Sequence, residues 1–196
     1  MSRRTLSLSL TLAAIAIAPA ALHAQNRSPL ADRITVSAAF GGLSGAANLN
    51  DAGTADWRLG WAGSLDASYW ILPRVALRVG GTWAQDSLRS GAIAGRGKFN
   101  KFAYDADIVL RYPLTTGAST VTPYILGGAG AISVHQLASD STWTKFAGNF
   151  GGGVEYRFGR LGVRAEGRDY VYKFDRYGFD KTAHDIAWQG GVTVSF

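Results

Sequence analysis

The chain has 196 residues, of which 47% are hydrophobic and 17% charged, with a formal net charge of +6 and no cysteine. This length suits a single domain, and the lack of cysteine excludes a fold held together by disulfide bonds. The charge is mildly basic without a run of like charges, so the composition gives no footprint of nucleic-acid binding.

The first 24 residues have the pattern of a secretory signal peptide. Arg3 and Arg4 form a positive start, and the apolar stretch 6–24 ends in small residues. We expect cleavage after Ala24, which leaves a domain of residues 25–196 and lowers the formal charge from +6 to +4 through the loss of the two arginines. Beyond residue 24 no apolar run approaches the ~18 residues of a membrane-spanning helix, so any membrane segment must consist of strands.

Eight segments after residue 24 alternate between polar and apolar residues with a period of two, which predicts β-strands with two different faces. Each predicted strand is longer than the roughly five or six residues typical of globular proteins, and long enough to cross a bilayer when tilted. The predicted strands are 32–42, 57–70, 75–87, 98–113, 120–135, 144–158, 161–174 and 184–196.

The connections between these segments alternate between long and short. The long connections are 42–56, 88–97, 136–143 and 175–183, and the short ones are 71–74, 114–119 and 159–160. Up-and-down strands with long loops at one end and tight turns at the other are typical of outer-membrane barrels. The sequence therefore predicts an all-β fold, namely an eight-stranded antiparallel up-and-down transmembrane β-barrel with both termini at the short-turn end.

The apolar face of the predicted strands carries most of their aromatic residues. In the sixth strand Phe146, Phe150 and Tyr156 share one side, with Asn149 and Glu155 on the other. An eight-stranded barrel is only wide enough to be filled by its own side chains, so this many rings must face outward. Because such a surface aggregates in water but suits lipid, we expect the rings to form girdles at the two membrane interfaces.

The polar face then lines the interior and carries charges of both signs, with Lys101, Lys145 and Asp185 among them. Opposite charges on neighbouring strands compensate one another, whereas an isolated buried charge is very costly. We therefore predict a packed ionic interior in place of a water-filled pore. The predicted network consists of Arg58, Asp66, Arg78, Asp105, Asp107, Arg111, Glu155, Arg157, Arg164, Glu166 and Arg168.

The seventh strand departs from this pattern. Strict alternation sends Asp169 and Lys173 toward lipid and the rings of Tyr170 and Tyr172 inward. A β-bulge near Gly167 would reverse the facing of the remainder and place the rings in the outer girdle. Alternatively, the strand has left the membrane at this point, and the sequence leaves the choice open.

Candidate catalytic and metal-binding residues are few. Ser133 and His135 share a face of the fifth strand, and His184 begins the eighth. Residues two apart on a strand are separated by about 6–7 Å, too far for a nucleophile to bond directly to its base. Asp105 and Asp107 could suggest a metal site, but the arginines nearby favour salt bridges. We therefore assign no catalytic residue, no cofactor and no metal.

The motifs "TPYILGGAG" and "FGGGVEYRFGRLGVRAEGRDYV", the eight amphipathic segments and the terminal Phe196 resemble the small outer-membrane β-barrel proteins of Gram-negative bacteria, the OmpA/OmpX-like group. The resemblance covers residues 25–196. It implies a location in the outer membrane, contact with outer-membrane lipid and lipopolysaccharide, and recognition of the last strand with Phe196 by the barrel-assembly machinery.

We expect a monomer without enzymatic activity that has a structural or adhesive role and acts through its long loops. Three alternatives remain open at this point: a narrow channel for ions or small solutes, a lipid A-modifying enzyme, and a soluble secreted barrel.

Overall fold

The structure is a computed structural model that describes residues 33–45, 55–57, 59–90, 98–116, 119–137, 141–175 and 181–196. The predicted signal peptide 1–24 and the predicted network residue Arg58 lie outside the described residues.

Nearly all of the described residues lie in β-strands. The strands are β1 (Ile34–Gly45), β2 (Ala55–Trp57), β3 (Gly60–Leu72), β4 (Val75–Ser90), β5 (Lys98–Arg111), β6 (Leu114–Thr116), β7 (Ser119–Gln136), β8 (Ser141–Phe158), β9 (Leu161–Phe174) and β10 (Lys181–Ser195).

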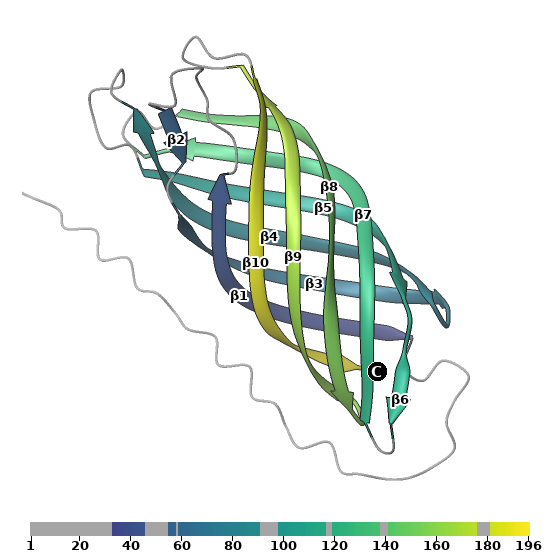
Figure 1. Cartoon of the computed structure of the whole chain (residues 1–196). Coiled ribbons are helices and arrows are strands. Elements are labelled where there is room, and N and C mark those ends of the chain that lie inside the picture. The colour runs from purple at the N-terminus through teal and green to yellow at the C-terminus, as the bar shows by residue number, and fades with distance from the viewer. Residues whose placement is uncertain are drawn as a thin grey trace, which may run out of the picture.

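Eight of these strands close into an antiparallel barrel in the order β1, β3, β4, β5, β7, β8, β9 and β10, and β10 pairs again with β1 (Figure 1). The two short strands extend the wall, β2 by pairing with β4 and β6 by pairing with β7. At the closure, the N–H of Phe196 donates to the carbonyl of Ile34 at 2.8 Å. The predicted eight-stranded up-and-down barrel is confirmed.

The pairing partners show how far the strands are staggered. The cross-strand partner of Ile186 in β10 has its own partner on the next strand, and so on around the barrel. This series of partners returns to the chain at Phe196, ten residues after Ile186. The partners on the way are Asp169, Phe150, Gly127, Ile108, Leu77, Tyr69 and Ile34. For eight strands this stagger gives a tilt of about 40° and a backbone radius of about 8 Å, which leaves room for side chains only.

The barrel buries its polar face and exposes its apolar one. In β5, Tyr104 is 45% exposed, whereas its neighbour Asp105 is 8% exposed. Phe146 on β8 is 75% exposed. In the same strand, Asn149 is buried. This arrangement inverts that of a soluble barrel and confirms that the apolar face points outward, as a lipid environment requires.

Aromatic side chains gather at both ends of this outward apolar belt. We call the end of the barrel with the long connections the loop end, and the end with the tight turns 73–74 and 159–160 the turn end. Near the loop end the rings of Trp61 and Trp83 meet edge to face, with centroids 5.5 Å apart. Near the turn end Tyr156 and Phe158 lie 6.2 Å apart. With the tilt above, Phe146 and Phe158 are about 30 Å apart along the barrel axis, comparable to the apolar band of about 25 Å in outer-membrane barrels.

The strands reach further into the predicted loops than the hydropathy pattern indicated. The structure pairs Gln136 with Ser141, so the predicted loop 136–143 shrinks to residues 137–140. Outward residues at these strand ends are polar, as at Ser133 and Thr142. The apolar alternation stops where the membrane ends, but backbone pairing continues into water. The alternating pattern therefore underestimates strand length at the loop end.

The seventh strand of the barrel, β9, keeps strict alternation. Its register with β8 and with β10 runs without a shift, so the bulge considered near Gly167 is absent from the described strand. Tyr170 and Tyr172 are 2% and 3% exposed and point inward. Asp169 takes an outward position between Phe150 and Ile186.

The closest strand contacts predict which glycines the barrel cannot replace. A Cβ at the inward-facing Gly130 would meet the carbonyl oxygen of Tyr104 and come within 2.7 Å of the Cα of Asp105. We expect Gly130→Val to lower the free energy of unfolding by about 1–3 kcal/mol or more and to reduce the heat-modifiable folded band on an unboiled gel. The control is Gly148→Ala, whose Cβ meets nothing within 4 Å. If Gly130→Val and Gly148→Ala gave equal amounts of folded protein, the close contact between Gly130 and β5 would be contradicted.

Candidate functional site in the barrel interior

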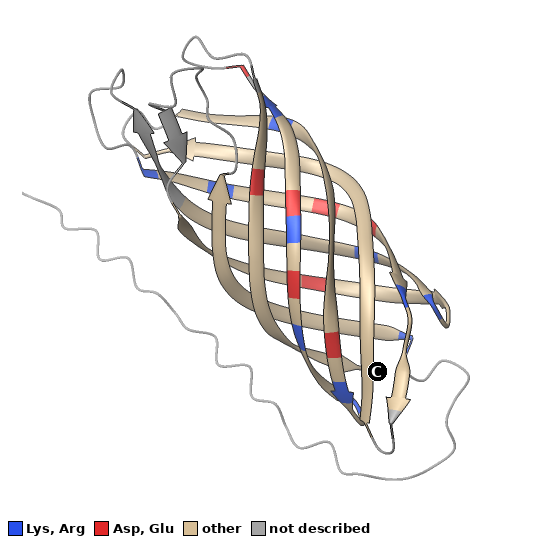
Figure 2. Ribbon diagram, viewed as in Figure 1, with Lys and Arg blue, Asp and Glu red and all other residues tan. Residues whose placement is uncertain are grey.

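The interior of the barrel is filled by three layers of side chains. At the loop end, an apolar layer includes Leu43, Phe99 and Trp143. At the turn end, a second apolar layer is built around Trp70 and Tyr124. An ionic layer lies between the two, and charged residues of both signs follow one another along β9 (Figure 2).

Glu166 on β9 is the centre of the ionic layer. Its carboxylate accepts hydrogen bonds from Arg78 at 2.6 Å, from Arg168 at 3.0 Å and from the hydroxyl of Tyr124 at 2.8 Å. A guanidinium nitrogen of Arg164 lies 3.9 Å away. Because Glu166 is only 7% exposed, these donors replace the water that its charge would otherwise need.

Ion pairs cross the lumen and tie opposite walls of the barrel together. Arg164 of β9 donates two hydrogen bonds to Asp66 of β3, at 3.0 and 2.5 Å. Arg78 of β4 reaches Glu166 of β9 and also lies 3.6 Å from Asp66. Since β3 and β9 are separated in the wall by β1 and β10, these contacts pass through the interior and not along the sheet.

Arg168 explains why two carboxylates stand side by side on β5. One of its guanidinium nitrogens lies 2.8 Å from Asp105 and 3.2 Å from Asp107. Asn149 donates to Asp107 at 2.9 Å. The hydroxyls of Tyr170 and Thr82 lie 2.9 Å apart at the edge of the cluster. The two aspartates therefore belong to the salt-bridged lining.

The remaining residues of the predicted network lie nearer the turn end and form separate contacts. Arg157 pairs with Glu155 on the same strand at 2.8 Å. Arg111 donates to the carbonyl of Pro73 at 3.0 Å, and its guanidinium lies 3.4 Å above the ring of Trp70. The structure therefore divides the predicted set into a central cluster and a rim.

The two apolar layers were missed by the sequence reasoning. Trp70 is 8% exposed, and its indole N–H donates to Thr35 at 3.0 Å. Tyr124 is buried beneath Arg78, whose guanidinium lies 5.3 Å from the centre of its ring. Strict alternation along β3 and β7 already placed both rings on the inward face, and that signal was available in the sequence.

A second buried ion pair stands toward the loop end. Lys101 donates to Asp185 at 2.7 Å, and the Tyr172 hydroxyl donates to the same carboxylate oxygen at 3.0 Å. Lys101 is 2% exposed and Asp185 fully buried. At the rim, Lys145 pairs with Asp175 at 2.7 Å and is far more accessible. Charge compensation therefore continues from the centre of the barrel to its loop end.

The ionic layer encloses almost no empty space. The cavity between Asp66, Thr82, Glu166 and Arg168 measures about 10 Å³, enough for a single water molecule. Among the residues that the structure describes, no group of three His, Cys, Asp or Glu side chains is arranged to hold a metal ion.

The serine and histidines considered as catalytic candidates face outward near the loop end. The Ser133 hydroxyl lies 2.8 Å from that of Thr144, and the His135 ring lies 2.8 Å from that of Thr142. His184 of β10 contacts Asp169 of β9 at 2.8 Å. His135 of β7 is separated from this pair by β8. The structure does not bring the three candidates into one constellation.

A closed antiparallel barrel with an outward apolar belt, two aromatic girdles and a salt-bridged interior defines the class of outer-membrane β-barrels. The described residues contain no helix that is long and apolar enough to span a membrane. The family model of the outer membrane protein beta-barrel domain matches residues 8–196. The chain belongs to this family, and its place is the outer membrane.

Solved structures of the same class resemble this barrel. Neisserial surface protein A is similar with a TM-score of 0.63 and 17% identity, over 85% of this chain and 99% of the other. The N-terminal β-barrel domain of Pseudomonas aeruginosa OprF gives 0.47 and 17%, over 85% and 99%. Ail, the attachment invasion locus protein of Yersinia pestis, gives 0.47 and 14%, over 83% and 97%. A comparison with curated protein sequences gives no match.

The pair across the lumen predicts a large effect of single substitutions. Arg164→Met leaves the buried Asp66 without its two-bond partner, and we expect the free energy of unfolding to fall by about 3–5 kcal/mol. The double variant Arg164→Met with Asp66→Leu removes both charges and should recover most of this loss. Urea titration in lipid vesicles, followed by gel mobility, measures both.

The control is Lys145→Met, because Lys145 pairs with Asp175 at the far more accessible rim. This control substitution should lower the free energy of unfolding by about 1 kcal/mol or less. If Arg164→Met and the double variant unfold at the same urea concentration, the ion pair does not couple the two walls.

Proposed function

We propose that the protein acts at the cell surface, as an adhesion or surface-interaction protein whose barrel is a rigid and closed support for its loops. One observation carries the proposal: the lumen is filled from end to end, with Trp70 near one end, Trp143 near the other and the Glu166 cluster between them. A barrel filled in this way offers no wide path for solutes. Its accessible chemistry is then concentrated at the loop end.

The strand ends support the same proposal. β1, β4, β8 and β10 all extend past the apolar belt, where outward side chains such as Thr142 and Thr144 are polar. The connections 46–54 and 91–97 follow directly from β1 and β4. Connections held on a rigid scaffold are where binding residues are most often found, because they can vary without disturbing the fold.

The test replaces the loops and leaves the barrel intact. Exchanging 46–54 and 91–97 for Gly/Ser segments of equal length should lower the adhesion of expressing cells by about tenfold, the equivalent of one or two lost anchor contacts. The probes are immobilised matrix proteins and sulfated glycans, and the host is a non-adherent Gram-negative strain. The control exchanges residues 137–140 in the same way and should retain adhesion.

The same preparations separate the alternatives. A stable, porin-sized conductance in planar bilayers would overturn the closed-barrel proposal in favour of a channel. A change in the mass of lipid A in expressing cells would favour a lipid A-modifying enzyme. We expect neither, and adhesion that survives the exchange of both loops would contradict the proposed role.

We further propose that the last strand and Phe196 are recognised by the barrel-assembly machinery, as the family resemblance implies. The ring of Phe196 is 56% exposed at the turn end, and its backbone pairs with Ile34. Phe196→Ala, which keeps the backbone pairing with Ile34, should slow insertion into the outer membrane of cells several-fold but leave refolding into detergent micelles unchanged. Equal slowing in both assays would instead indicate a purely structural role.

A further inference from the structure

Asp169 is a carboxylate on the lipid-facing side of the barrel. Its partners across the strands are Phe150 and Ile186, two exposed apolar residues. It lies eight residues along β9 from Leu161 at the turn end, about 20 Å up the barrel axis and so inside the apolar belt. Within the described part of the chain, no other Asp, Glu, Lys or Arg side chain faces outward between the two girdles. Charged groups in this position are costly and usually functional.

Only one of the two oxygens of the Asp169 carboxylate has a hydrogen-bonding partner among the described residues. One oxygen, Oδ2, lies 2.8 Å from Nδ1 of His184. The other oxygen, Oδ1, is buried and has no hydrogen-bond partner among the described residues. The cross-strand neighbours Phe150 and Ile186 have no side-chain donor to offer it. The side chain as a whole is 16% exposed, so the carboxylate can be reached from the membrane side and has acceptor capacity beyond its one contact with His184.

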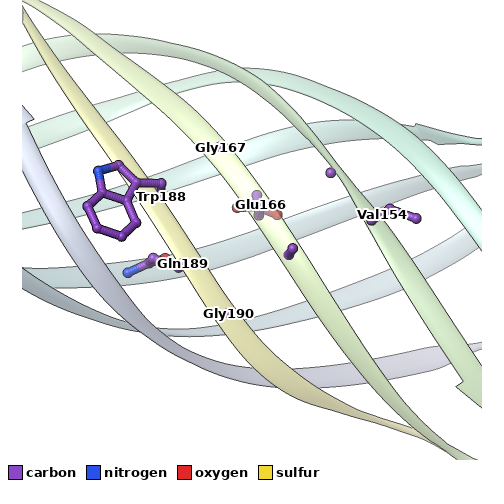
Figure 3. Close-up of a pocket in the computed structure, with 8 residues that line it drawn as sticks. Val154, Glu166, Gly167, Trp188, Gln189 and Gly190 are labelled. Carbon is purple, nitrogen blue, oxygen red and sulfur yellow. The ribbon is translucent and has the colours of Figure 1, made fainter.

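A shallow apolar groove of about 490 Å³ lies on the outward face of β8, β9 and β10 (Figure 3). Its outward lining comes from Val154 of β8, from Ala165 and Gly167 of β9, and from Trp188 of β10. Gly167 is two residues from Asp169, and a Cβ placed on it would meet nothing within 4 Å. Packing within the barrel therefore does not require glycine here, and its effect is to hollow the lipid-facing surface.

We propose that the groove and the Asp169–His184 pair together bind one acyl chain of lipid A. The hydrocarbon would lie in the groove, and an amide N–H or a 3-hydroxyl near the carbonyl end of the chain would donate to the exposed part of the Asp169 carboxylate. The depth of Asp169 favours this donor, because the ammonium of a phospholipid head group lies at or above the girdle.

This site is independent of the proposed role of the loops. It lies on the outer wall of β8, β9 and β10, within the membrane, whereas the proposed adhesion surface lies beyond the belt. A failure of the lipid proposal would leave the loop experiment unaffected, and the reverse also holds.

Native mass spectrometry of the full chain, folded in detergent with defined lipid added, tests the groove. With hydroxylated, amide-linked lipid A as the probe, Gly167→Leu should lower the bound fraction about tenfold because its side chain fills the hollow. The matched control is Gly127→Leu on β7. Gly127 faces outward at a similar depth, and its Cβ would meet only Asn149 O at 3.8 Å. Equal binding by the two variants would overturn the proposal.

A second comparison tests the carboxylate. Wild type should prefer lipid A to phosphatidylglycerol, whose acyl chains carry no such donor, by about tenfold or more. Asp169→Leu should abolish this preference, and Asp169→Asn, which keeps an acceptor oxygen, should retain most of it. Heat-modifiability of each variant verifies the fold. Equal retention of both lipids by wild type, or a preference unchanged in Asp169→Leu, would contradict the proposed contact.

Discussion

No water is available in the core of a bilayer, so every backbone N–H and C=O of a spanning chain must be paired within the protein. For this chain the requirement is met when β10 returns to β1 and Phe196 pairs with Ile34. Closure with a stagger of ten residues sets the tilt at about 40° and the radius at about 8 Å. The interior then has a fixed volume, and the inward side chains of eight strands must fill it.

The interior is ionic because the outward face of the barrel is apolar. A chain with apolar residues on both faces would be too hydrophobic to cross an aqueous compartment before insertion, whereas this chain has a mean hydropathy of only +0.02. Polar residues inside must then compensate one another. Glu166 gathers Arg78, Arg164 and Arg168, while aromatic layers around Trp70 and Phe99 separate the charges from water at both ends.

The alternation of polar and apolar residues was enough to predict the eight strands of the barrel, their order and the side on which most residues lie. Lipid outside requires apolar side chains and the small lumen requires compensated polar ones, so the two faces differ at every step along a strand. The alternation could not predict that Arg164 meets Asp66, since that contact depends on the stagger between strands far apart in the chain. The positions of the strand ends were also predicted wrongly, because backbone pairing continues past the residues at which the apolar pattern stops. The signal peptide and the role of the loops stay predictions.

The outward position of Asp169 follows from the inward demands of the same strand. A bulge that turned Asp169 inward would turn Tyr170 out, and the phenol would leave its contacts with Thr82 and Asp105. The register of β9 also aims Arg164, Glu166 and Arg168 into the lumen, where they carry most of the ionic layer. Keeping these contacts fixes Asp169 in the belt, where its carboxylate lies 2.8 Å from Nδ1 of His184.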